Sequence, residues 1–307
     1  MTLDFVKMHA AGNDYIYLDC FGSEPDKPQK IAKMLSRRHF SVGADGIVLV
    51  LPSARAHARM RIFNADGSEA STCGNALRCV AKWLWESGFV RKSHITVETD
   101  SGIRDVFLSV RDGRVGAITV DMGVCRTGEH ISLSVGGEKY ELLTVRAGNE
   151  HQVAVTPDVD ALDLARIGHI FEKNPHFEGG VNTEFYEIVG DNTLKVRTFE
   201  RGSGETLACG SGACASALAA AAAGDCNASR PIKIRMRGGE LSVLLLPCRN
   251  EEKTAESHPS SRAEALEHNS PKEMKAHASR EIGDSNLALR AFLTGDAHTA
   301  FRGTVDM

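Results

Sequence analysis

The sequence predicts an α+β protein of two pseudo-symmetric domains related by an internal duplication, each a mostly antiparallel sheet curled around a central helix. One observation behind this is a repeated motif, Cys73-Gly74-Asn75 and Cys209-Gly210-Ser211, at an offset of 209 − 73 = 136 residues. A second is that strand-like stretches outnumber helical ones in each half of the chain. A third is that no Gly-rich phosphate turn follows a strand in a strict βαβ pattern, which argues against a Rossmann fold.

Glycines far from the cysteines keep the same offset. The pairs are Gly12/Gly148, Gly43/Gly179, Gly88/Gly224 and Gly102/Gly238. Because glycine marks turns and close backbone approaches, matched glycines indicate matched turns. A repeat of this length is too long for a solenoid unit and fits two homologous domains. We therefore expect Cys73 and Cys209 to be symmetry mates that face one cleft.

In the first half the sequence predicts two helices among short strands. The first helix begins near Asp26 and Pro28. The second begins at Cys73, keeps an apolar i, i+3, i+4, i+7 spacing, and ends at Gly88 as a C-terminal cap. The strands are expected at residues 3–8, 15–19, 47–50, 60–64, 95–98, 106–110 and 117–122.

The second half repeats this plan. Helices are expected near residues 163–171 and from Cys209 to Gly224, and strands at residues 185–189, 194–199, 240–246 and 287–293. Residues 249–286 are rich in Glu, Lys, Ser, Ala and His and poor in large apolar residues, so they cannot bury enough surface to offset chain entropy. We expect a disordered insertion there. The expected domains are residues 1–124 with 294–307, and residues 125–293.

Composition excludes several functional classes. The 307 residues suffice for two domains, and the net charge of −4 gives no reason to expect nucleic acid or an anionic membrane as a partner. The first residues carry Asp4, Lys7 and His9 where a signal peptide would have an apolar run. Eight cysteines without such a signal indicate reduced thiols in a cytoplasmic protein.

A cysteine at a helix N-terminus is expected to gain thiolate character, because unsatisfied N–H groups and the helix dipole favour the anion. Gly74-Asn75 and Gly210-Ser211 leave backbone N–H groups accessible beside Cys73 and Cys209. Two such termini could hold a substrate carboxylate and place one sulfur on each face of the attached carbon. This constellation predicts a two-base inversion, in which one thiolate removes the α-proton and the opposite thiol returns a proton.

The chain resembles the diaminopimelate epimerase family outside residues 249–286. The resemblance rests on five stretches: Lys7-Met8-His9 with Gly12-Asn13-Asp14; the run from Asn64 to Glu69; Cys73-Gly74-Asn75 with Arg78-Cys79; Glu200-Arg201-Gly202 with Gly204-Glu205-Thr206; and the run from Ala208 to Cys214. It implies the two-domain fold with the C-terminal strand returning to the first half.

The resemblance also implies an isomerase that interconverts LL- and meso-diaminopimelate without a cofactor, in lysine and peptidoglycan precursor biosynthesis. Cys73 and Cys209 would be the acid/base pair, and Glu200 and His151 would assist near the reacting carbon. The residues implied to hold the diamino-dicarboxylic acid are Asn13, Asn64, Gly74, Asn75, Asn149, Asn182, Glu200, Arg201, Gly210 and Ser211. A homodimer is compatible with the resemblance. The chain departs from the family in having Glu150 where proline is usual.

Three alternatives stay open at this stage. The enzyme could act on another amino acid, such as histidine or proline, or the chain could be a non-catalytic amino-acid-binding protein of the same fold. A zinc site formed by Cys73, Cys79, Cys209 and Cys214 ranks below catalysis because no Cys-x2-Cys spacing is present. The six other cysteines are expected to be buried apolar residues.

Overall fold

The structure, a computed structural model, describes residues 2–248 and 287–306 and divides into two compact units. Unit 1 comprises Met1–Val120 with Thr294–Met307, and unit 2 comprises Asp121–Leu293. The insertion expected at residues 249–286 lies outside the described residues. Among the residues that are described, no helix is both long and apolar enough to cross a membrane.

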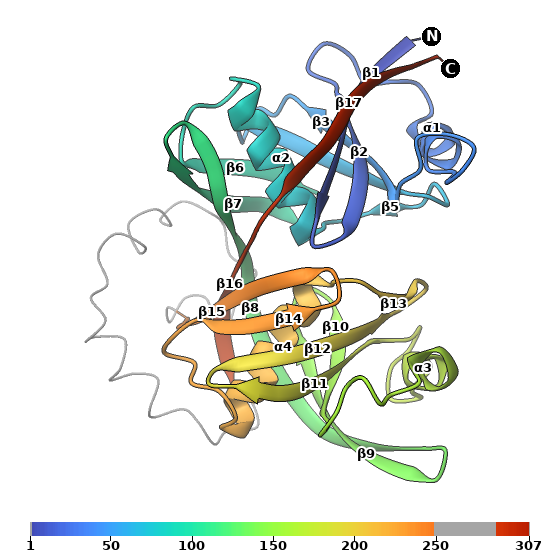
Figure 1. Ribbon diagram of the computed structural model, residues 1–307, viewed down its shortest axis with the longest axis vertical. Coiled ribbons are helices and arrows are strands. Elements are labelled where there is room, and N and C mark those ends of the chain that lie inside the picture. Colours follow the sequence, from blue (N-terminus) through green and yellow to red (C-terminus); the bar gives the residue numbers. More distant parts are fainter. Residues whose placement is uncertain (1, 249–286, 307) are drawn as a thin grey trace. The chain divides into compact units, whose positions relative to one another are not determined.

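Unit 1 is a sheet with one helix inside its curl and one outside (Figure 1). Helix α2 packs against β1, β2, β6 and β7, whereas α1 packs against β3 and β4. Pro28 at the start of α1 matches the predicted helix start. The elements are β1 Thr2–Ala10, β2 Asn13–Asp19, α1 Pro28–Leu35, β3 Gly46–Leu51, β4 Ala58–Asn64, β5 Glu69–Ala70, α2 Gly74–Glu86, β6 His94–Thr99, β7 Gly102–Arg111 and β17 His298–Asp306.

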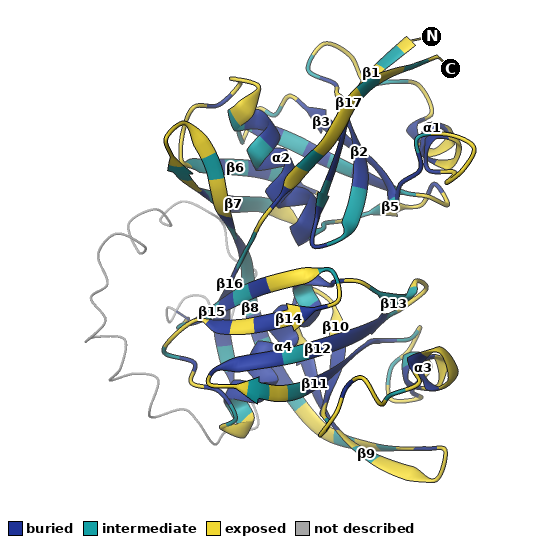
Figure 2. Ribbon diagram, in the orientation of Figure 1, coloured by how far each residue is buried: buried dark blue, intermediate teal, exposed yellow. Residues whose placement is uncertain are grey.

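Unit 2 has the same plan, with α4 inside the curl and α3 outside. Helix α4 contacts β9, β10, β11, β12, β14 and β15. Its residues are nearly all small and buried around the whole helix, whereas α3 is buried along one side only (Figure 2). The elements are β9 Glu138–Arg146, β10 Glu150–Val155, α3 Leu164–Glu172, β11 Asn182–Gly190, β12 Thr193–Glu200, β13 Gly204–Thr206, α4 Gly210–Ala223, β14 Ile232–Met236 and β15 Gly239–Pro247.

Two long connections join the units along the chain. Strand β8, Arg114–Val135, passes from unit 1 into unit 2, and it is much longer than the strand expected at residues 117–122. Strand β16, Ala288–Gly295, pairs with β8 and leads the chain back into unit 1. There β17 pairs with β1 in antiparallel fashion, from Thr2↔Asp306 to His9↔His298. The predicted return of the C-terminal strand to the first half is confirmed.

Strand register confirms the duplication. In unit 1 the parallel pair β2–β3 aligns Tyr15 with Gly46, and in unit 2 the pair β10–β11 aligns His151 with Asn182, each 136 residues further on. The ion pairs also repeat: Arg61 contacts both carboxylate oxygens of Glu69 at 2.7 and 2.9 Å, and Arg197 contacts those of Glu205 at 2.7 and 3.1 Å. The two halves therefore share backbone and side-chain contacts.

One predicted glycine match is wrong. Gly102 pairs with Thr99 at the turn between β6 and β7, and the residue in the same position of unit 2 is Gly239, which pairs with Met236. The offset here is 239 − 102 = 137, so Gly238 is not the mate of Gly102. The left-handed cap glycines Gly88 and Gly224 still keep the offset of 136. The one extra residue of unit 2 therefore lies in the loop between the central helix and the next strand, β6 in unit 1 and β14 in unit 2.

Candidate functional site

Cys73 caps the N-terminus of α2, as predicted. Its backbone is extended (φ −150°, ψ 117°), and its carbonyl accepts the first helical hydrogen bond, from the amide of Leu77 at 3.0 Å. The side chain is half-buried, and its Sγ donates to Oδ1 of Asn13 at 3.5 Å. Gly74 follows it in the first turn. A helix start with free N–H groups thus lies beside the sulfur.

A network of charged residues fixes Asn13. Its Nδ2 donates to Oδ2 of Asp45 at 2.9 Å, which leaves Oδ1 turned toward Cys73. Asp45 also accepts from the amide of Asp14 and from Arg38. Asp14 in turn contacts the buried amine of Lys7 at 2.5 Å. The Lys7 and Arg38 cations hold the pKa of the Asp14 carboxyl below its usual value even though burial opposes this.

Asn64 and Asn75 complete the predicted set in unit 1. Asn64 ends β4 opposite Gly46, and its Nδ2 donates to Oγ of Ser68 at 3.0 Å. Asn75 is 3% exposed, and its Oδ1 accepts from the fully buried Arg78 at 2.7 Å. Its Oδ1 is therefore committed to Arg78, so Asn75 can approach a ligand only through its Nδ2 group and its backbone N–H.

Cys209 caps α4 in the same way, but its surroundings differ. It is 6% exposed, and its Sγ accepts from the amide of Gly212 at 3.4 Å and lies 3.4 Å from Oγ of Ser211. Burial raises the pKa of the Cys209 thiol well above its usual value, and the nearby Glu200 and Glu184 carboxyls raise it further. The helix start alone would favour a thiolate, whereas burial and the two carboxyls favour the thiol form of Cys209.

Glu200 ends β12 and is half-buried next to Cys209. Burial raises the pKa of its carboxyl, whereas hydrogen bonds with Thr206 and Cys209 lower it. Thr206 donates to Oε1 of Glu200 across the β12–β13 turn. The carboxyl is thus oriented by a hydroxyl and lies beside the thiol.

His151 and Asn149 lie at the start of β10. His151 is fully buried; its Nε2 lies 2.8 Å from Oδ1 of Asn149, and its Nδ1 lies 3.0 Å from both carboxylate oxygens of Glu184. Asn149 itself is exposed. The adjacent Glu150, which replaces the proline usual in the family, is also exposed. Its carboxylate forms an ion pair with Nη1 of Arg146 at 3.7 Å.

Asn182 and Arg201 lie at the same end of the antiparallel pair β11–β12. Asn182 begins β11 and is 6% exposed, and its Oδ1 accepts from the backbone amide of Arg201 at 2.8 Å. The Arg201 side chain is exposed at the surface of unit 2, with Nη1 3.5 Å from the carbonyl of Gly180. Gly210 is buried and Ser211 half-buried in the first turn of α4.

The predicted residues therefore form two sets, one in each unit. Each set occupies equivalent places: the start of one strand, the end of another and the start of the central helix. Two residues that hold them are not among the predicted ones: Asp45, which contacts Asn13, and Glu184, which contacts His151. A comparison of the two halves could have identified Glu184, because its mate 136 residues earlier is the apolar Val48. Within residues 2–248 and 287–306, no cluster of His, Cys, Asp or Glu suits a metal ion.

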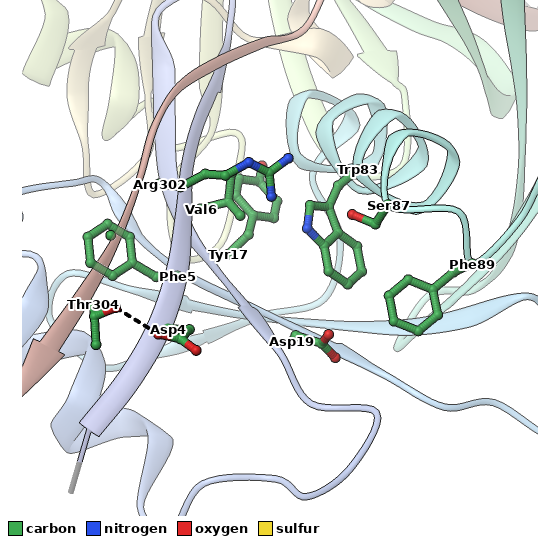
Figure 3. Close-up of a pocket in the computed structure, with 11 residues that line it drawn as sticks. Asp4, Phe5, Val6, Tyr17, Asp19, Trp83, Ser87, Phe89, Arg302 and Thr304 are labelled. Atoms are coloured by element: carbon green, nitrogen blue, oxygen red, sulfur yellow. Dashed lines mark hydrogen bonds between the residues drawn. The ribbon is translucent and has the colours of Figure 1, made fainter.

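A cavity lies elsewhere in unit 1. It has a volume of about 500 Å³ and lies beside Tyr17 and Arg302 and the C-terminal end of α2, where Trp83 and Phe89 contribute aromatic rings (Figure 3). Cys73 is at the opposite end of this helix, which at 1.5 Å per residue is roughly 20 Å away. The cavity is therefore separate from the Cys73 set.

Comparison with known proteins agrees on one family. The diaminopimelate epimerase family model matches residues 5–127 and 143–256. The diaminopimelate epimerase of Desulfovibrio desulfuricans is 43% identical over 262 residues, covering 79% of this chain and 91% of that protein. That of Acetivibrio thermocellus is 42% identical over 252 residues, covering 78% and 89%.

Two solved structures share the fold at low identity. A probable proline racemase from Agrobacterium radiobacter superposes with a TM-score of 0.68 at 17% identity, covering 99% of this chain and 92% of that chain. A phenazine biosynthesis protein of the PhzF family from Bacillus anthracis gives a TM-score of 0.69 at 15% identity, with both chains covered completely (100%).

Proposed function

The chain belongs to the diaminopimelate epimerase family, and on that premise we propose that it interconverts LL- and meso-diaminopimelate by moving the α-proton between two cysteines. The observation that carries this proposal is the matched pair of helix starts, α2 and α4, each capped by a cysteine. Lysine and peptidoglycan precursor biosynthesis is the implied setting. The chemistry is that of an isomerase.

In the proposed mechanism Cys209 is the acid in the resting enzyme. The raised pKa of Cys209 keeps the proton on its sulfur. Cys73, whose thiol donates to Asn13 and interacts with the buried Arg78 cation, would lose that proton to water and then remove the α-proton as a thiolate. The Cα–H bond breaks toward Cys73, and a new Cα–H bond forms on the opposite face with the proton from Cys209. The reverse reaction exchanges the two roles. The N–H groups at the start of α2 and α4 would stabilise the negative charge that develops on the substrate carboxylate.

Substrate binding is proposed to use both sets of residues. Asn13, Asn64 and the backbone N–H groups of Gly74 and Asn75 would contribute from unit 1. The residues from unit 2 would be Asn149, Asn182, Glu200, Arg201, Gly210 and Ser211, with His151 and Glu200 assisting near the reacting carbon. The guanidinium of Arg201 is exposed and suits one carboxylate of a dicarboxylic acid. No cofactor is required by this scheme.

The test is α-proton exchange in D2O across a panel of amino acids, without added pyridoxal phosphate. Exchange with diaminopimelate alone supports the proposal, whereas exchange with histidine or proline would identify a racemase of another substrate. No exchange with any compound that binds would indicate an amino-acid-binding protein. We further propose a cytoplasmic location, where thiols stay reduced, and a homodimer, to be checked by sedimentation.

We expect Cys73→Ala and Cys209→Ala each to lower the rate of epimerisation by about 10²- to 10⁴-fold, because each removes one acid/base group. The measurement is circular dichroism or NMR of the diastereomer ratio over time. Cys226→Ala is the matched control, since this cysteine lies beyond the end of α4 and should leave the rate unchanged. Near-normal epimerisation by either of the first two variants contradicts the two-base scheme.

A further inference from the structure

A buried carboxylate, Glu184, lies behind His151, and its contact with this histidine has no role in the mechanism described so far. Glu184 and His151 are both 0% exposed, and Nδ1 of His151 lies 3.0 Å from each carboxylate oxygen. Thr198, on the neighbouring strand β12, donates to Oε1 of Glu184 at 3.0 Å. All three residues belong to unit 2, so the cluster is complete within one unit.

Unit 1 shows that the fold does not require this cluster. The mates of His151, Glu184 and Thr198 at offset 136 are Tyr15, Val48 and Ile62. Val48 pairs with Ile62 in β3–β4 in the same register in which Glu184 pairs with Thr198 in β11–β12. Removing charged groups from water costs several kcal/mol per ion unless partners compensate. The same sheet is built in unit 1 from apolar residues, so the polar cluster serves something other than folding.

The first turn of α4 is adapted to the carboxylate. A Cβ at Gly212 would overlap Oε1 of Glu184 and lie 3.0 Å from its Cδ, so only glycine leaves room there. The mate of Gly212 in unit 1 is Ala76, and the mate of Glu184 is the apolar Val48. The glutamate and the glycine therefore occur together in unit 2, and both are replaced in unit 1. The start of a helix also favours an anion.

We propose that Glu184 is a positioning residue that keeps His151 protonated on both ring nitrogens and, through it, fixes the orientation of Asn149; this inference rests on the proposed function. A carboxylate can only accept, so His151 donates to Glu184 from Nδ1. The amide oxygen Oδ1 of Asn149, 2.8 Å from Nε2, can also only accept, so Nε2 donates to it. With Oδ1 so engaged, the Nδ2 group of the exposed Asn149 side chain is the part available to a substrate carboxylate. A carboxylate that accepts from Nδ1–H orients the imidazole and stabilises the imidazolium.

The test replaces Glu184 by Gln in the full chain, which keeps the volume and removes the charge. We expect kcat/KM to fall by about 10²-fold, with a rise in KM, because Asn149 is no longer held. The ¹⁵N chemical shifts of the His151 ring are expected to show a proton on both ring nitrogens in the wild type and on only one of them in E184Q. Glu187→Gln, on the same strand with its carboxyl bonded to the amide of Val159, is the matched control and should change neither.

A second variant separates positioning from stability. Glu184→Val with Gly212→Ala introduces the pair that unit 1 carries, and we expect it to fold with a similar unfolding midpoint and to be inactive. If E184Q and this double variant both fail to fold, the cluster is structural and the inference is wrong. Unchanged ¹⁵N shifts or unchanged kcat/KM in E184Q also overturns it. The ¹⁵N measurement needs no substrate, so it stays decisive even if diaminopimelate is not turned over.

Discussion

The residues around the two cysteines carry charges of opposite sign. In unit 1 the buried Arg78 donates from Nε to the carbonyl of Asp296 at 2.9 Å and interacts electrostatically with Cys73. The mate of Arg78 in unit 2 is the uncharged Cys214, and the groups near Cys209 are the carboxyls of Glu200 and Glu184. A cation favours a thiolate and an anion disfavours it. The two sulfurs therefore differ in their tendency to ionise, although the backbone around them is duplicated.

This difference predicts how Cys209 reacts with an alkylating agent. Because the reactive species is the thiolate, alkylation of Cys209 by iodoacetamide should become fast only above the pH at which ordinary thiols react. Glu200→Gln removes one of the charges that raise the pKa of Cys209, so its alkylation profile should shift to lower pH. Mass mapping of the labelled peptide gives the rate at each pH. Glu138→Gln at the exposed start of β9 is the control. Alkylation profiles that coincide for the wild type and E200Q would refute this assignment.

At the scale of the elements, the start of β3 depends on a glycine that its mate does not need. A Cβ at Gly46 would overlap the carbonyl oxygen of Phe63 and lie 3.0 Å from Cε1 of Tyr15. In unit 2 the matching residue is Asn182, whose side chain is accommodated and accepts from the amide of Arg201. The requirement for glycine therefore arises from local packing in unit 1.

Gly46→Ala should accordingly lower the free energy of unfolding by about 1–3 kcal/mol, the usual cost of overpacking. Denaturant titration measures it. Gly22→Ala is the matched control, because no atom lies within 4 Å of the position its Cβ would take. Equal unfolding midpoints for G46A and G22A would contradict this prediction, because they would show that β3 and β4 accommodate the added Cβ at position 46 without a loss of stability.

At the scale of the whole molecule, the described residues on either side of residues 249–286 lie next to each other. Sγ of Cys248 donates to the carbonyl of Ala288 at 3.5 Å, and Leu287 is held by Thr127 through its amide at 2.8 Å. The chain thus leaves β15 and enters β16 at neighbouring points. A short turn can join such ends, and the cost of loop closure rises only slowly with length.

Deleting the segment and joining Arg249 to Asn286 through a short Gly-containing turn should therefore preserve folding and turnover. Thermal unfolding and kcat/KM of the deletion variant are the measurements, with the full chain as reference. A variant that unfolds at the same temperature but loses activity would show that the segment contributes to the site. A large loss of stability would show that it contributes to the fold.

Local patterns were sufficient for the elements that carry the cysteines. Spacing, capping and glycine turns predict the N-caps at Cys73 and Cys209 and the ends of α2 and α4 near Gly88 and Gly224. The same signals predict the strands that lead to these helices. These signals act between residues a few positions apart. Because of the duplication, an element predicted in one half of the chain was also expected at the matching position of the other half. The matched positions also pointed to most residues of the candidate site.

What only the tertiary structure decided depends on packing between distant residues. No local pattern predicts the length of β8 or the burial of Glu184 against Gly212. Nor does one predict the shift of one residue that makes Gly239 the equivalent of Gly102. The same holds for the protonation of Cys209: the helix start visible in the sequence favours a thiolate, but desolvation and two carboxyls from other strands favour the thiol. Charge and burial are set by the residues that folding brings together, so the chemistry of the pair required the folded chain.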